Sequence, residues 1–138
     1  MKALLLSIRP EYVEQILKGT KKFEYRKRLA KEDVDVIYIY STAPKMKVVA
    51  SVEVIDRVSG SPTALWESTK KLAGISRAKY REYFRGCKTA YAYKLGSVQI
   101  FDTAKELSDF GISAAPQSFA YVDIEHKLSD FSFNCVRD

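Results

Sequence analysis

The chain has few of the residues from which metal and redox sites are built. Its 138 residues include two cysteines, Cys87 and Cys135, and one histidine, His126. The cysteines form no Cys-x-x-Cys pair, which excludes a zinc knuckle and a dithiol redox motif. We expect both thiols to be reduced and structural, and His126 to be an exposed side chain in a charged segment rather than a ligand or base. No metal and no cofactor are expected.

Long hydrophobic runs and the common nucleotide and hydrolase motifs are also absent. The longest aliphatic run near the start is residues 3–6, whereas a membrane span needs about 20 apolar residues and a signal peptide a longer apolar region than this. We therefore expect a cytoplasmic protein that does not enter a membrane. The sequence has no Gly-x-Gly-x-x-Gly, Walker loop, His-Glu-x-x-His or Gly-x-Ser-x-Gly. The common signatures of nucleotide-binding proteins, metalloproteases and hydrolases are therefore absent. It also lacks repeats and Pro/Gly/Ser-rich linkers, so one domain over residues 1–138 is expected.

What the sequence does contain is an irregular succession of strands and short helices. Apolar residues make up 46% of the chain, enough for a folded core. Strands are predicted at residues 3–8, 20–28, 34–41 and 46–58, and as one long bulged strand over 88–101. Helices are predicted from Pro10 to a stop at Gly19, from Ser61 to 72, from Ser76 to 85, and after a Thr103–Glu106 capping box that Gly111 closes. The order favours an α+β fold with a small, mostly antiparallel barrel over a doubly wound parallel sheet.

Basic residues are concentrated in two segments. Residues 1–31, the first basic segment, have a net charge of +6, and residues 70–88, the second basic segment, also have a net charge of +6. The rest of the chain is acidic, at −3 for residues 32–69 and −3 for residues 89–138. If the fold joins the two segments they form one positive surface suited to phosphates. The alternative is two unrelated solvated faces.

The candidate site lies in the first basic segment. Lys21, Glu24 and Arg26 form its centre, and Ser7 and Arg9 reach it from the preceding strand. A carboxylate between two cations can accept from the amino edge of a base while the cations hold a phosphate or a carbonyl. Strand alternation places Glu24 and Arg26 on one face, together with Arg28, and Lys21 on the face of Phe23 and Tyr25. The alternative is a surface ladder of ion pairs.

Three segments of this sequence resemble signature segments of one family. Residues 7–10 (Ser-Ile-Arg-Pro) followed by residues 16–26, with the spacing Gly-x-Lys-x-x-Glu-x-Arg, are similar to the opening signature of ASCH domains, the activating signal cointegrator homology family. Residues 38–44 resemble its second signature strand and residues 115–121 its closing segment. The resemblance implies a PUA-like fold, a small β-barrel flanked by helices with a cleft proposed to receive RNA or a nucleotide. It places Lys21, Glu24 and Arg26 on the cleft floor and brings near it Ser41, Thr42, Gln117 and Ser118.

Three functions are compatible with these residues. The first is an RNA-binding or nucleotide-binding module in RNA metabolism or in the regulation of transcription or translation, with Arg77 and Arg81 of the second basic segment on phosphates. The second is an enzyme in which Lys21 and Glu24 are catalytic: some members of the family deacetylate N4-acetylcytidine and others resemble ribonucleases. Lys21 matches the lysine of the deacetylases, but Glu24 stands where they have a threonine nucleophile. The third is a protein-interaction or regulatory subunit.

Overall fold

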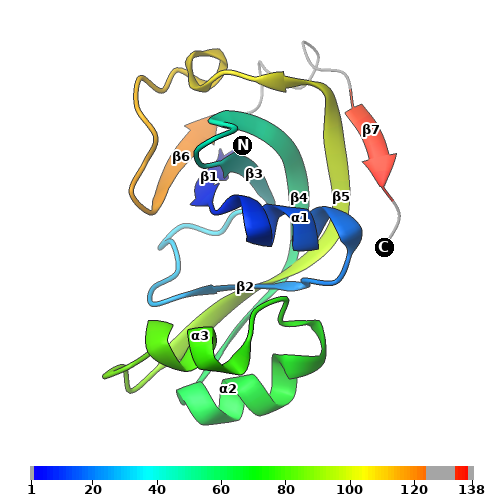
Figure 1. The fold of residues 1–138 in the computed structure, drawn as a ribbon. Helices are drawn as coiled ribbons and strands as arrows, with labels where there is room; N and C mark the ends of the chain where they lie inside the picture. The colour runs from blue at the N-terminus through cyan, green and yellow to red at the C-terminus, as the bar shows by residue number, and fades with distance from the viewer. Residues whose placement is uncertain (1, 124–132, 137–138) are drawn as a thin grey trace.

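The computed structural model describes residues 2–123 and 133–136, which form one curled sheet with helices at its side and at one end (Figure 1). The strand order is β2-β5-β4-β3-β1-β6, and β7 pairs with β5. The strands are β1 (Lys2–Ile8), β2 (Phe23–Arg26), β3 (Val36–Ser41), β4 (Lys47–Gly60), β5 (Ala90–Lys105), β6 (Phe119–Asp123) and β7 (Phe133–Val136). The predicted α+β class is confirmed.

The sheet is mostly antiparallel, and its two longest strands give it its shape. Among the strands that the structure describes, only β1 and β3 run parallel, whereas the other pairs are antiparallel. β5 pairs with β4 along one side, and with β2 and then β7 along the other. Register shifts interrupt the β4–β5 ladder at several places, and such bulges increase the local twist and bend a strand. The predicted bulged strand is therefore confirmed, and it is longer than expected.

Local signals in the sequence set the limits of the helices. α1 (Pro10–Lys18) begins at a proline and ends before Gly19, whose φ of +83° favours glycine. The Ser61 and Ser76 side chains cap α2 (Pro62–Thr69) and α3 (Arg77–Tyr83) by accepting backbone hydrogen bonds. A 3-10 turn, η1 (Lys70–Leu72), follows α2. The helices predicted at these places are confirmed, and the two later ones are shorter than expected.

Two predictions of local structure are wrong in their limits or type. The helix predicted after Thr103 is absent, because β5 continues to Lys105, which pairs with Val48 of β4. Only a short 3-10 helix, η2 (Leu107–Phe110), follows, and Glu106 caps it in place of Thr103. The strand predicted over residues 20–28 is limited to β2, which is as far as its pairing with β5 extends. His126 lies outside the described residues, and Cys87 is a free thiol.

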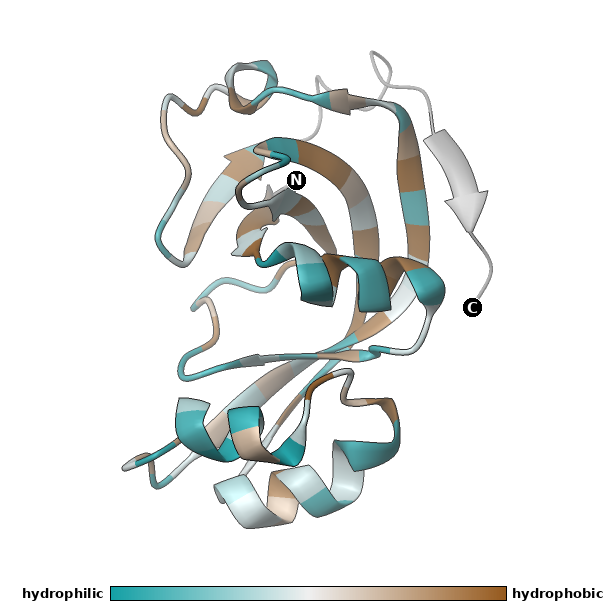
Figure 2. Ribbon diagram, in the orientation of Figure 1, coloured by the Kyte–Doolittle hydropathy of each residue, from teal (hydrophilic) through white to brown (hydrophobic). Residues whose placement is uncertain are grey.

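The apolar core among the described residues contains three clusters, and Figure 2 shows that many of the most hydrophobic residues lie in the strands of the curled sheet. One cluster lies between α1 and the curled strands, and a second includes the buried Tyr38. The third fills the space between β2, β5 and the helices α2 and α3, with Tyr25, Tyr80 and Phe84 at its centre. No helix among the described residues is long and apolar enough to cross a membrane. In residues 2–123 and 133–136 no group of metal-ligating side chains gathers either.

Candidate functional site

The carboxyl end of β1 is the place where the predicted site segments meet. Because β1 and β3 are parallel, Ile8 lies opposite Ser41, and the Thr42 amide donates to the Ile8 carbonyl at 3.0 Å. The Ser7 hydroxyl donates to the Pro116 carbonyl at 2.7 Å, which brings the segment before β6 to the same end. Three segments that are far apart in the sequence therefore converge here.

Glu24 and Arg26 form the centre of this site. Arg26 donates to the Glu24 carboxylate through Nε at 3.1 Å, and its Nη2 lies 2.9 Å from the same oxygen. Nη2 also donates to the Ser7 carbonyl at 3.1 Å, which ties β2 to the end of β1. The Arg26 side chain is only 14% exposed and the Glu24 side chain only 10%. The pair is therefore not a surface ladder but a largely desolvated ion pair.

Lys21 lies beside this pair and is almost completely buried, with 3% of its surface exposed. Its ammonium donates to the Ala73 carbonyl at 2.7 Å and lies 5.4 Å and 4.9 Å from the ring centroids of Tyr12 and Tyr25. Burial lowers the pKa of Lys21, and the nearby Glu24 carboxylate opposes this shift. An ammonium has three donors, and the Ala73 carbonyl accepts from one of them while the two tyrosine rings lie around the others.

The backbone at residues 73 and 74 holds the Lys21 side chain in place. Gly74 has a φ of +63°, and a Cβ built there would lie 2.4 Å from Lys21 Cβ and 2.7 Å from Lys21 Cγ. Only glycine allows this close approach. In addition, the Lys22 amide donates to the Leu72 carbonyl at 2.8 Å. The chain after α2 is thus fitted against the residues that precede β2.

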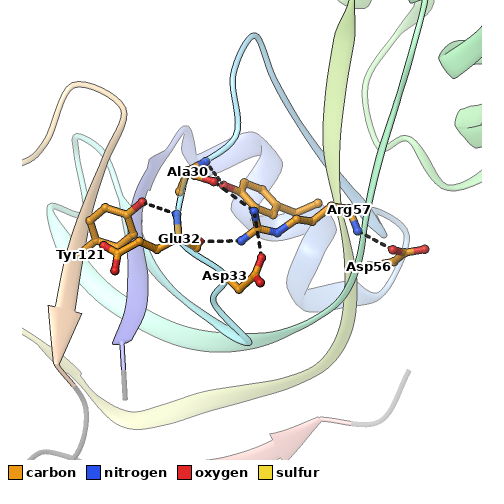
Figure 3. A network of polar contacts seen from close by, with 7 residues as sticks. Ala30, Glu32, Asp33, Asp56, Arg57 and Tyr121 are labelled. Atoms are coloured by element: carbon orange, nitrogen blue, oxygen red, sulfur yellow. Dashed lines mark hydrogen bonds and ion pairs between the residues drawn. The ribbon is translucent and has the colours of Figure 1, made fainter.

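A polar network fixes the loop that carries Arg28 (Figure 3). The Arg57 guanidinium of β4 donates to the Ala30 carbonyl at 3.1 Å and to the Glu32 carbonyl at 2.8 Å. The Tyr121 hydroxyl of β6 accepts from the Glu32 amide at 3.0 Å. The loop between β2 and β3 is therefore held from both sides, while Arg28 itself is exposed on it.

The two basic segments adjoin in this fold. Besides the contact of Lys21 with Ala73, Lys27 Nζ lies 5.0 Å from the ring centroid of Tyr83, and Lys79 Nζ lies 3.8 Å from the Glu11 carboxylate. Figure 1 shows the same arrangement, with α3 beside β2. The sequence left open whether the segments join or form separate faces, and these contacts show that they join.

The structure does not bring all the predicted site residues into the cluster. Arg9 lies at the start of α1 and is exposed, and so are Gln117 and Ser118 in the segment before β6. Arg77 and Arg81 are exposed on α3, where they line a separate cavity against α2. The predicted residues are therefore divided: Lys21, Glu24 and Arg26 lie together by the end of β1, Arg77 and Arg81 line the cavity on α3, and Arg9, Arg28, Gln117 and Ser118 are exposed.

Several groups near Lys21 were not predicted as part of the site. Tyr12 and Tyr25 were not among the predicted site residues, yet their rings lie close to the ammonium. The Ala73 carbonyl comes from a segment that carries no polar motif, and neither Ala73 nor Gly74 was predicted to lie at the site. A basic residue directly after a glycine turn, with aromatic residues nearby, was the signal available for the first two.

Comparisons with known proteins point to one family and fold. The family model described as ASCH domain matches residues 6–100. A protein of Zymomonas mobilis described as an ASCH domain-containing ribonuclease is 32% identical over 95 residues, which cover 68% of this chain and 64% of that protein. A protein of Ureaplasma parvum described as ATP synthase subunit alpha is 28% identical over 120 residues, which cover 86% of this chain and 15% of that protein. The chain thus spans less than two thirds of the length of each of these two relatives.

A solved structure has the same fold over nearly the whole chain. The crystal structure of ASCH from Zymomonas mobilis superposes with a TM-score of 0.85 and 27% identity, and the match covers 94% of this chain and 96% of that one. The expected PUA-like fold is thereby confirmed. The likeness extends beyond the family-model match of residues 6–100, because it covers 94% of the chain.

Proposed function

Because the chain belongs to the ASCH domain family, we propose that it binds RNA at the end of β1. The observation that carries this proposal is the largely buried cluster of Lys21, Glu24 and Arg26 next to two joined basic segments. Exposed lysines and arginines around it supply the sequence-independent attraction for phosphates. The cluster supplies groups that can recognise one nucleotide, since a carboxylate accepts from a base edge and the cations donate to oxygens.

Cleavage of the bound RNA is the second candidate function. Two observations favour it: the Zymomonas relative is described as a ribonuclease, and burial lowers the pKa of Lys21. A lysine with a lowered pKa can exchange a proton closer to neutral pH than an exposed lysine, which makes it a better general acid or base. Deacetylation of N4-acetylcytidine has less support, because the residue at the position of the threonine nucleophile, Glu24, is bound to Arg26.

The test is RNA binding and turnover measured on the same samples. A labelled single-stranded RNA, a labelled duplex RNA and N4-acetylcytidine are each incubated with the protein over a salt series, and the products are analysed by mass spectrometry. The variants are Lys21→Met and Glu24→Gln, which remove one charge each with little change of shape. The matched control is Lys45→Ala, which removes an exposed charge outside both basic segments.

We expect affinity for RNA to fall steeply with salt for all proteins, and to be weaker in both cluster variants than in Lys45→Ala. RNA fragments that form with wild type and not with Lys21→Met would support the ribonuclease function. Binding without fragments would leave the binding function alone. Absence of RNA binding at low salt, in protein that circular dichroism shows to be folded, would refute the proposal.

A further inference from the structure

A cavity between α2 and α3 lies apart from the cluster at the end of β1. Its volume is about 260 Å³, and its walls come from both helices. The lining residues are Pro62, Thr63, Trp66, Glu67, Arg77, Tyr80, Arg81 and Phe84. Pockets for drug-sized ligands measure about 300–1,000 Å³, so this cavity has the size for one planar group with its substituent. It thus combines aromatic rings with two arginines.

The aromatic wall of the cavity is rigid. Tyr80 is 2% exposed, and its hydroxyl donates to the Pro62 carbonyl at 2.7 Å. Its ring lies 4.8 Å from that of Trp66 and 4.9 Å from that of Phe84, measured between centroids. Trp66 is only partly buried, so part of its surface is available to a ligand. Preformed aromatic surfaces of this kind bind nucleobases by stacking.

The two arginines of the cavity are available for an anion. Arg77 and Arg81 are one helical turn apart on the same side of α3, and both are exposed. Neither guanidinium forms an ion pair with another residue that the structure describes. In contrast, Arg85 in the next turn is paired with Glu82. A guanidinium presents a planar set of donors that matches a phosphate.

The remaining charged group of the cavity is Glu67, which limits the kind of ligand. Its carboxylate is bound to Lys70 at 3.0 Å at the surface. A carboxylate beside the arginines disfavours a bare inorganic anion, but it can accept from the amino group of a base. Aromatic surface, paired arginines and one acceptor together are complementary to a nucleotide rather than to an ion.

We propose that this cavity is a second nucleotide site, which takes one base and its phosphate from a single-stranded RNA that also occupies the cluster at the end of β1. The inference rests on the proposed function and extends it. The two sites share an aromatic layer: the Tyr25 ring lies 4.9 Å from Lys21 Nζ on one side and 4.9 Å from the Tyr80 ring on the other. The two sites are therefore neighbours, separated by one buried aromatic layer.

A second hollow extends this path beyond the cavity. It has a volume of about 440 Å³ and is lined by Ala78, Arg81, Glu82 and Arg85. Arg81 borders both spaces, so a phosphate bound by Arg81 lies between them. A single strand can thus place a base against Trp66 and continue its backbone along α3. A duplex cannot do so, because its bases are stacked and paired.

The experiment uses Trp66 as the reporter, since it is the only tryptophan of the chain. Trp66 emission is recorded during titration with a single-stranded RNA of eight nucleotides, a duplex of the same sequence, a nucleoside 5′-monophosphate and inorganic phosphate. Affinity for the labelled RNA is measured in parallel by anisotropy over a salt series. The test variant is Arg77→Ala with Arg81→Ala. The matched control is Lys71→Ala with Lys88→Ala, which removes two exposed charges of the same basic segment outside the cavity.

We expect the single strand to quench Trp66 emission, and the arginine variant to bind it about tenfold more weakly than the lysine control, as expected for one stacked base and its phosphate. The slope of log affinity against log salt should be smaller in the arginine variant by about 0.7, the value for one lost phosphate contact on a single strand. The duplex and inorganic phosphate should leave the emission unchanged.

Other results overturn the inference and can be told apart from failure of the proposed function. Single-stranded RNA that binds without quenching, or equal losses in the two double variants, would show RNA binding at the cluster but no second site. Quenching by the monophosphate without any binding of RNA would make the cavity a site for free nucleotides and contradict both proposals. Quenching by inorganic phosphate alone would make it a simple anion site.

Discussion

Gly74 provides the sharpest test of how Lys21 is held. Replacing it with alanine adds one methyl group at a position where φ is +63° and where the new Cβ would lie 2.4 Å from Lys21 Cβ. Both atoms are next to the backbone, so rotation of a side chain cannot relieve the contact, and one of the two segments has to move. The hydrogen bond from Lys21 to Ala73 should lengthen or break as a result.

The expected loss of stability has two parts. A left-handed backbone costs a residue with a Cβ about 1–2 kcal/mol relative to glycine, and overpacking adds about 1–3 kcal/mol. Gly86 separates the two parts, because its φ is +80° and a Cβ there would meet nothing within 4 Å. We therefore expect Gly86→Ala to lose only the first amount, and Gly74→Ala to lose about 3 kcal/mol or more.

Denaturant unfolding of wild type and the two variants measures both values under the same conditions. RNA affinity gives a second readout. Gly74→Ala should weaken RNA binding because Lys21 is displaced, whereas Gly86→Ala leaves Lys21 in place and should weaken RNA binding less than Gly74→Ala does. Equal destabilisation by the two substitutions would refute the reasoning, since it would mean that residues 73–74 do not confine Lys21.

Three further predictions concern the surroundings of the site. Tyr25→Phe removes a 2.6 Å hydrogen bond to Thr69 and should lower the free energy of unfolding by about 1 kcal/mol; no loss in urea unfolding would contradict it. Arg57→Met should speed amide hydrogen exchange in residues 27–35, because two loop carbonyls lose their donor; unchanged exchange would show that Arg57 does not hold the loop. Because the pKa of Lys21 is lowered in the folded state, the unfolded chain binds more protons between that lowered pKa and 10.5, so the contribution of this group to stability rises with pH through that range. Unfolding measured from pH 7.5 to 10.5 should show a smaller rise in Lys21→Met than in wild type, and parallel curves over the whole range would contradict the lowered pKa of Lys21.

Local patterns in the sequence were sufficient for most elements. The aliphatic and aromatic run at residues 36–41 forms β3, and the serine-capped starts at Ser61 and Ser76 begin α2 and α3. Alternation along β2 placed Glu24 and Arg26 on one face, where they form their ion pair. In these places the local preference and the tertiary fold favour the same conformation.

The remaining features depend on contacts between distant residues. The Thr103 capping pattern is a helix signal, but β5 pairs with β4 as far as Lys105 and therefore continues past Thr103 as a strand. The partner of Lys21 is a backbone carbonyl 52 residues away, and no side-chain pattern marks such a group. Likewise, the cavity beside Trp66 arises from the angle between α2 and α3, which the residues of neither helix determine alone.

The most direct test of the account is photo-crosslinking of the protein to a single-stranded RNA that carries 4-thiouridine, with the crosslinked peptides identified by mass spectrometry. If the two basic segments form one RNA-binding surface, crosslinks should appear in residues 20–31 and in residues 76–88 of the same complexes, and both sets should decrease with salt. Crosslinks confined to one segment, or spread evenly over the acidic residues 32–69 as well, would contradict it.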